Sequence, residues 1–365
     1  MFIFMYFCQP KLSTHNPRFD MTAFAERLKS ARKMKGWSLQ DLSDNLTLAL
    51  SKQALSKYEQ GEMNPGSDVL IALANALDVK PDYFLREPIE LGEIAFRKTP
   101  DLSAKEIDRI TELVKDHLER YLEVEELLGI TTQFKSPIKD KVISDPEQID
   151  GLVAQLNKAW NLGYDPIPNV IDMLEEHNVK VIEIDADDKF DGLSTWVDKI
   201  PVVVVSKHYS VERKRFTALH ELGHLVLSID KGADEERICH AFAGAMLLPD
   251  GSLEKLLGNK RKNIAMGELV SIKEQFGISI QAIMMRAQLK GIVDKTFVSK
   301  FWRAIGGNKK EIGLGKFKGN EKSYRFQHLV FRLAAEEIVS LSKAANLAGK
   351  KLAQFREELD APETK

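Results

Sequence analysis

The stretch Thr217-Ala-Leu-His-Glu-Leu-Gly-His224 decides the fold of the larger part of this chain. On a helix, His220 and His224 are four residues apart and share one face, so both imidazoles can reach a single metal ion. Glu221 lies about 100° further round the helix, where its carboxylate would contact a metal-bound water rather than the metal. Apolar residues on both sides of the motif predict a buried helix, which gives a metal site a rigid setting.

A second helix is needed to complete such a site, because a catalytic zinc usually keeps three protein ligands and one open position. The motif alone arises by chance in unrelated helices, and two ordinary histidines are then the simpler interpretation. Here a turn at Lys231-Gly232 precedes a predicted helix that starts with Glu235 and Glu236. That helix can pack back against the first and supply a carboxylate ligand, which favours a metal site.

Two longer patterns surround these residues. Residues 213–224 read Arg-x-Arg-Phe-Thr-x-x-His-Glu-Leu-Gly-His, and residues 236–249 read Glu-x-x-Cys-His-x-Phe-Ala-x-x-Met-Leu-Leu-Pro. Together they resemble the ImmA/IrrE metallopeptidases, and the resemblance extends over about residues 100–350. It implies a zincin-like fold, a Zn²⁺ cofactor and members that cleave helix-turn-helix repressors. The ligands that it implies are His220, His224 and Glu236.

The chain departs from the family pattern at Cys239-His240, where members usually carry Ala-Asn. Glu235 and His240 therefore stay open as alternatives to Glu236 for the third ligand. Cys239 is interpreted as a small buried residue rather than a ligand.

The expected chemistry is hydrolysis of a peptide bond. A bound zinc lowers the pKa of its water to about 7, and Glu221 is the expected general base, which returns the proton to the leaving amine. The strand Pro201–Val205 is either an edge that accepts substrate as an added strand or a plain core strand. No residue is identified for stabilising the oxyanion. Four residues just upstream of the motif are expected at the surface: His208, Tyr209, Arg213 and Arg215.

The N-terminal part carries a different signature. Residues 50–61 read Leu-Ser-Lys-Gln-Ala-Leu-Ser-Lys-Tyr-Glu-Gln-Gly, and residues 70–77 read Leu-x-x-Leu-Ala-x-Ala-Leu. They resemble the Cro/repressor-type (XRE) helix-turn-helix family over residues 23–86. The helix after Ser51 is then the recognition helix, whose first residues face base edges in the major groove. The candidate DNA-contacting residues are Lys52, Gln53, Ser56 and Lys57.

The charge of this head limits its affinity for DNA. Residues 21–87 hold nine Lys/Arg and nine Asp/Glu, so non-specific binding to the phosphate backbone should be modest. A helix-turn-helix used only for protein contact is the alternative.

Composition indicates where the protein works. The chain has 365 residues, 44% of them hydrophobic, and a formal net charge of −2, which is typical of a globular protein and identifies no partner. Only the cysteines Cys8 and Cys239 are present, so a disulfide framework is not expected. The protein is expected in a reducing compartment. The apolar opening, residues 1–8, is too short to span a bilayer. We expect a cytoplasmic protein with no membrane partner.

The predicted fold is multidomain. An all-α helix-turn-helix head is followed by a long linker helix at Ser103–Leu128, a zincin-like α/β (α+β) metallopeptidase domain and a mostly helical C-terminal region. The expected limits are a disordered leader at 1–20, the head at 21–87, the linker at 88–148, the peptidase core at 149–255 and the C-terminal region at 256–365.

The sequence therefore predicts a cytoplasmic zinc-dependent, site-specific endopeptidase that binds double-stranded DNA through its head. Its expected protein substrate is a transcriptional repressor of the helix-turn-helix type, whose cleavage relieves repression. Two other classes are considered: a non-catalytic transcription regulator that uses the zinc domain as a sensor or partner-binding module, and an antitoxin-like binding protein. The presence of Glu221 favours the enzyme, because a purely structural zinc site would not need it. A homodimer is left open.

Overall fold

The computed structural model describes residues 21–86, 102–131, 133–138, 141–186 and 190–361. The leader expected at 1–20 and part of the expected linker lie outside these residues. The chain forms two compact units that separate close to residue 89, and each is described by itself. The finer domain limits at residues 148 and 255 remain predictions.

The head is all helical, as predicted. Ser38 and Ser51 act as N-caps, because each side chain accepts a hydrogen bond from a backbone N–H in the first turn of the helix that follows it. Asp41 also accepts a bond from the backbone of Ser38, which completes a capping box. The elements are α1 (Met21–Met34), α2 (Leu39–Asn45), α3 (Lys52–Glu59), α4 (Ser67–Leu77) and the 3₁₀ helix η1 (Pro81–Leu85). Their shared core contains Phe24, Leu28, Leu42, Leu55, Leu73, Leu77 and Phe84.

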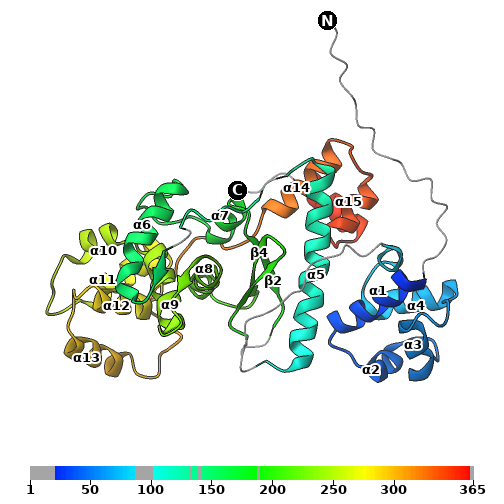
Figure 1. Cartoon of the computed structure of the whole chain (residues 1–365), viewed down its shortest axis with the longest axis horizontal. Coiled ribbons are helices and arrows are strands. Elements are labelled where there is room, and N and C mark those ends of the chain that lie inside the picture. The colour runs from blue at the N-terminus through cyan, green and yellow to red at the C-terminus, as the bar shows by residue number, and fades with distance from the viewer. Residues whose placement is uncertain (1–20, 87–101, 132, 139–140, 187–189, 362–365) are drawn as a thin grey trace, which may run out of the picture. The chain divides into compact units, whose positions relative to one another are not determined.

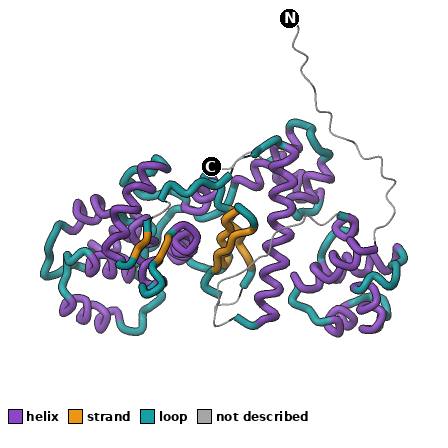
Figure 2. Tube along the Cα trace, viewed as in Figure 1, coloured by secondary structure: helices purple, strands orange, loops and turns teal. Residues whose placement is uncertain are grey.

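The second unit is mixed but mostly helical, and Figure 2 shows its few strands among many helices. The helices up to the second sequence pattern are α5 (Ala104–Leu127), η2 (Pro146–Gln148), α6 (Ile149–Ala159), α7 (Val170–Glu176), α8 (Val211–Val226) and α9 (Glu235–Leu247). The later helices are α10 (Asp250–Leu257), α11 (Met266–Phe276), α12 (Ile280–Leu289), α13 (Lys295–Ile305), α14 (Arg325–Ala335), α15 (Leu341–Leu347) and α16 (Leu352–Asp360). The multidomain α+β class predicted from the sequence is confirmed.

The main sheet has three strands in the order β2-β4-β3. The strands are β2 (Lys180–Ile184), β3 (Leu193–Val197) and β4 (Ile200–Ser206); β4 runs parallel to β2 and antiparallel to β3. Of the two interpretations of Pro201–Val205, the core strand is confirmed and the edge strand is wrong, because β4 pairs on both sides. Its run of four valines is buried, as expected for a central strand covered on both faces.

A second, minimal sheet pairs part of the expected linker at 88–148 with the chain that follows α8. The strands β1 (Val142–Ile143) and β5 (Ser228–Ile229) form a parallel pair of two residues each. Strands this short carry too little periodicity to be detected in a sequence. The pairing ties the chain before α6 to the end of α8.

Helix α8 occupies the centre of this unit. It packs against β3 and β4 on one side and against α9 on the other, and Figure 1 shows α9 and α12 on the side away from the sheet. The apolar core around it runs from Ile138 to Ile305, so it is continuous across residue 255. Helices α14–α16 bury a separate apolar cluster together with Val124 of α5. No helix among the described residues combines the length and apolar character needed to cross a bilayer.

A buried ion pair fixes α8 to the C-terminal part of the chain. Arg215, expected at the surface, is instead fully buried, and its guanidinium donates to the carboxylate of Glu321 and to the backbone oxygen of Ile167. Glu321 also accepts hydrogen bonds from the first backbone N–H groups of α7, those of Val170 and Ile171. A sequence shows only that an arginine is charged, whereas its burial depends on a partner more than a hundred residues away.

We predict that Glu321→Ala lowers the free energy of unfolding by about 3–5 kcal/mol, because it leaves the Arg215 guanidinium buried without its counter-charge. Chemical denaturation of the full-length protein measures the change. The control is Glu336→Ala, which removes an exposed partner of Arg332 on the same C-terminal part and should cost less than about 0.5 kcal/mol. Equal losses in the two variants would contradict this account of the fold.

Candidate metal centre

The two histidines of the motif are presented by α8 toward α9. Ser210 caps the start of α8 by accepting a hydrogen bond from the backbone N–H of Arg213. A glycine in the motif favours close packing, because a Cβ at Gly223 would lie 3.3 Å from Cys239 Sγ and 3.3 Å from a ring carbon of Phe242 on α9, and these neighbours would have to shift. The absence of a side chain lets the two helices approach closely, and this approach brings the start of α9 within reach of the histidines.

Three potential ligand atoms converge at this point. The Nε2 atoms of His220 and His224 are 3.1 Å apart. The Glu236 carboxylate bridges them, with Oε2 at 3.2 Å from His220 Nε2 and Oε1 at 3.4 Å from His224 Nε2. Two imidazoles and one carboxylate form a donor set that suits zinc with an open fourth position.

Burial keeps the first histidine in the form that can bind a metal. Desolvation, with smaller effects from His240 and His224, lowers the pKa of His220 to about 3, so its ring is neutral. Among the described residues, its buried Nδ1 atom has no hydrogen-bond partner. The residues therefore fit a zinc ion bound through the Nε2 atoms.

The alternatives for the third ligand occupy other positions. Glu235 Oε1 lies 2.8 Å from His224 Nδ1, where a carboxylate fixes the tautomer and orients the ring for a metal on the opposite nitrogen. The His240 ring packs against that of His220 with centroids 4.5 Å apart, and His240 is not part of the converging group. Cys239 is buried, as predicted. Geometry favours Glu236, and the ligand assignment remains a prediction.

Glu221 follows His220 directly on α8, and its carboxylate is held against the sheet. The side chain is buried, and the hydroxyl of Ser194 on β3 donates to its Oε2 at 2.8 Å. The chain just before β3 can approach because residue 192 is a glycine: a Cβ there would lie 2.5 Å from Thr217 Cγ2. Sequence reasoning missed Ser194, since a serine in a short strand carries no signal of its own.

The other upstream residues form a surface group. Arg213 and Asp191 make an ion pair with both side chains more than half exposed, and the Arg213 guanidinium lies 4.0 Å from the ring centre of Tyr209. His208 Nε2 lies 2.7 Å from an Asp185 carboxylate oxygen, again at an exposed site. The expected surface position is confirmed for His208 and Arg213, whereas Tyr209 is half-buried.

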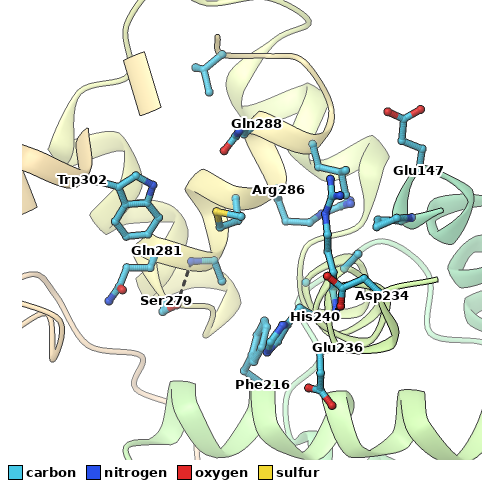
Figure 3. A pocket seen from close by; sticks show the side chains of 18 of the residues that line it. Glu147, Phe216, Asp234, Glu236, His240, Ser279, Gln281, Arg286, Gln288 and Trp302 are labelled. Atoms are coloured by element: carbon cyan, nitrogen blue, oxygen red, sulfur yellow. Dashed lines mark hydrogen bonds between the residues drawn. The ribbon is translucent and has the colours of Figure 1, made fainter. Parts of the chain in front are cut away.

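A large cavity opens next to the candidate centre. It has a volume of about 1010 Å³, and Glu236 and His240 form part of its wall. Figure 3 shows Phe216 and His240 side by side at one end, with Trp302 on another side of the cavity. The far wall comes from α12 and α13, which the sequence did not connect with the site.

The candidate DNA-contacting residues lie on α3 of the head. Lys52, Gln53 and Lys57 are exposed, whereas Ser56 is half-buried and accepts a hydrogen bond from the side chain of Gln60. The opposite face of α3 is anchored in the head core by Leu55. The helix is thus free to present three of the four residues, and their contact with DNA remains a prediction.

Comparison with known families identifies both parts of the chain. Residues 28–84 match the family described as Helix-turn-helix, and residues 174–288 match the IrrE N-terminal-like domain, a peptidase family. The chain therefore joins an XRE-type helix-turn-helix domain to an ImmA/IrrE-type domain, which confirms the resemblance seen in the sequence. The candidate metal centre lies inside the second match, and α13 lies beyond it.

Similar proteins from Bacillus subtilis (strain 168) are named as regulators. The SPbeta prophage-derived uncharacterized HTH-type transcriptional regulator YonR is 40% identical over 63 residues, 17% of this chain and 56% of that protein. The uncharacterized HTH-type transcriptional regulator YqaE is 38% identical over 63 residues, 17% of this chain and 53% of that protein. The HTH-type transcriptional regulator ImmR is 29% identical over 94 residues, 26% of this chain and 69% of that protein. This chain thus spans about half the length of the first two relatives.

We predict that His220→Ala and His224→Ala abolish zinc binding, because each variant loses one imidazole of the cluster. Glu235→Ala should weaken zinc binding by about 10–100-fold, as expected for a residue that only orients a ligand, and Glu236→Ala should weaken it more. Competition titration against a zinc-chelating dye measures all four, with His208→Ala as the unaffected control. A larger loss of zinc affinity in Glu235→Ala than in Glu236→Ala would indicate that Glu235 is the third ligand.

Proposed function

We propose that this protein is a zinc-dependent endopeptidase whose head binds DNA. The observation that supports the peptidase most strongly is the convergence of His220, His224 and Glu236, together with a buried carboxylate at Glu221, the residue that follows His220. A zinc site with a purely structural role has no use for that additional carboxylate. The IrrE-like domain supports the same class of enzyme.

The proposed reaction is hydrolysis of a peptide bond. A zinc ion at the cluster would supply a Lewis acid that activates water and polarises the carbonyl. Glu221 accepts a proton from the attacking water as the new C–O bond forms. When the C–N bond breaks, Glu221 returns that proton to the leaving amine nitrogen. The hydrogen bond from Ser194 fixes the carboxylate for both transfers.

A helix-turn-helix repressor is the proposed substrate, and cleavage would relieve repression in the cytoplasm. The ImmA/IrrE resemblance implies substrates of this type. The head offers support as well, because it is similar to proteins that are themselves named as helix-turn-helix regulators. A protein that combines such a head with a peptidase domain could act at the same promoters as its substrate.

The alternative is a regulator that senses zinc without cutting. It would use the same three ligands, and zinc binding alone would control the head. The two candidates differ in what they require of Glu221, which is essential for hydrolysis but dispensable for sensing.

We predict that Glu221→Gln keeps zinc bound but lowers the rate of cleavage by about 10²–10⁴-fold, because the amide preserves size and removes the proton acceptor. The full-length protein is incubated with purified helix-turn-helix repressors, with and without zinc, and discrete products are identified by mass spectrometry. Glu254→Gln, an exposed glutamate on α10, is the matched control and should cleave normally.

Two outcomes would count against this proposal. Undiminished cleavage by zinc-loaded Glu221→Gln would contradict the proposed role of Glu221 as the general base. Absence of cleavage in the wild type, together with a transcriptional reporter that responds to zinc and not to Glu221→Gln, would favour the sensor.

Binding of double-stranded DNA is proposed for α3 of the head. Gln53 could pair with adenine, and the two lysines could contact guanine or phosphate. With nine basic and nine acidic residues in 21–87, the head has little net charge to drive binding without specific contacts.

We predict that Gln53→Ala weakens specific DNA binding by the full-length protein by about 1–3 kcal/mol, because a bidentate base contact is lost. Sites selected from a random DNA library serve as the probe, and electrophoretic mobility shifts give the affinities. Asn75→Ala, which removes an exposed amide from α4, is the control and should bind as the wild type does. If no sequence is enriched at low salt, the head is a protein-contact module.

A further inference from the structure

The cavity beside the candidate metal centre has a mainly apolar surface, although polar side chains also line it. Phe216 of α8 and Ala282, Leu289 and Trp302 of the later helices are only partly buried, so the apolar core opens to solvent at this point. Met285 also lines the cavity and is 53% exposed. An exposed methionine in a concave apolar surface is typical of sites that adapt to bulky apolar groups.

Three of the charged residues in the wall are engaged by the protein itself. Asp234 and Asp294 accept hydrogen bonds from the first turns of α9 and α13, at 3.1 and 2.7 Å. Arg286 is buried and donates to Asp150 at 2.8 Å. Glu147, Arg237 and Lys295 also line the cavity, and most of the surface that a bound group would meet is apolar.

The position of the cavity indicates what would occupy it. Glu236 belongs both to the cluster of potential metal ligands and to the cavity wall, and His240, whose ring packs against that of His220, also lines the cavity (Figure 3). A polypeptide with its scissile bond at the cluster would therefore continue directly into the cavity. A volume of about 1010 Å³ exceeds the need of one side chain and accommodates several residues.

Part of the far wall lies outside the matched domain. The match to the IrrE N-terminal-like domain ends at residue 288, whereas Lys295 and Trp302 come from α13. The candidate catalytic groups thus lie within the shared domain, and part of the adjacent cavity is built by a segment outside it. Such a division is expected where the members of a family catalyse the same reaction but each binds a different substrate.

We propose that this cavity is a specificity pocket that binds two or three bulky apolar side chains of the polypeptide substrate, on one side of the scissile bond. The proposal rests on the proposed peptidase function and names the class of sequence that it would cut. Met285, Ala282 and Trp302 are the residues that would contact the apolar side chains.

A binding experiment tests the pocket without requiring catalysis. The probes are a fluorescein-labelled peptide Gly-Ala-Leu-Phe-Leu-Ala-Gly and its counterpart with serine in place of the three large apolar residues. Zinc-loaded full-length Glu221→Gln should bind the apolar peptide at least about tenfold more tightly by fluorescence polarisation. Adding Met285→Glu should remove that preference, whereas Met266→Glu, at another exposed methionine outside the cavity, should not.

A second variant tests the pocket in case Met285→Glu fails to fold. Ala282→Phe fills the cavity without adding charge and should also remove the preference, with an unchanged thermal unfolding temperature. Equal binding of the two peptides, or equal effects of Met285→Glu and Met266→Glu, would overturn the proposal. Binding of the apolar dye 8-anilinonaphthalene-1-sulfonate that depends on Met285, with no peptide binding, would also overturn it in favour of a small-molecule site.

A cleavage experiment separates this proposal from the proposed function. The wild type is incubated with a proteome-derived peptide library, and the new termini are identified by mass spectrometry. Large apolar residues should be enriched on one side of the cut, and Met285→Glu should lower kcat/KM for such peptides by at least about tenfold. Cleavage without enrichment of apolar residues would contradict the specificity pocket but would support the peptidase function. If the apolar peptide binds preferentially but no peptide is cleaved, the peptidase function is contradicted and the apolar binding site is retained.

Discussion

The close packing of α8 against α9 is the constraint on which the rest of the site depends. Gly223 lies inside the histidine motif, and the lack of a side chain at this position allows Cys239 and Phe242 of α9 to approach. Only this approach brings the Glu236 carboxylate to both Nε2 atoms, and only then does Glu235 reach the other nitrogen of His224. The glycine therefore acts on the geometry of the cluster although it contributes no functional group.

The surroundings make this geometry rigid. On the sheet side, the hydroxyl of Ser194 holds Glu221, and Gly192 allows that contact. On another face of α8, the fully buried pair of Arg215 and Glu321 joins the helix to the chain near the start of α7. Because Glu321 lies well beyond the matched IrrE-like domain, the C-terminal part of the chain contributes to the stability of the candidate centre.

Much of this organisation could be predicted from local signals. The capping serines Ser38, Ser51 and Ser103 marked helix starts, and the glutamates at the start of α9 indicated the second half of the centre. The features that were missed depend on residues far apart in the chain. The burial of Arg215 and the cavity between α9 and α13 follow from tertiary packing, which no short motif encodes. The family resemblance supplied the ligand set, whereas the structure supplied the reason why Glu235 and Glu236 differ.

The central claim is that the two histidines and Glu236 form a zinc centre with an open position. X-ray absorption spectroscopy of the zinc-loaded full-length protein tests it most directly. The account predicts two imidazole nitrogens and two oxygens, one from a carboxylate and one from solvent, at roughly 2.0–2.2 Å. A sulfur ligand at about 2.3 Å would bring Cys239 into the centre and contradict the claim, as would a closed shell without solvent.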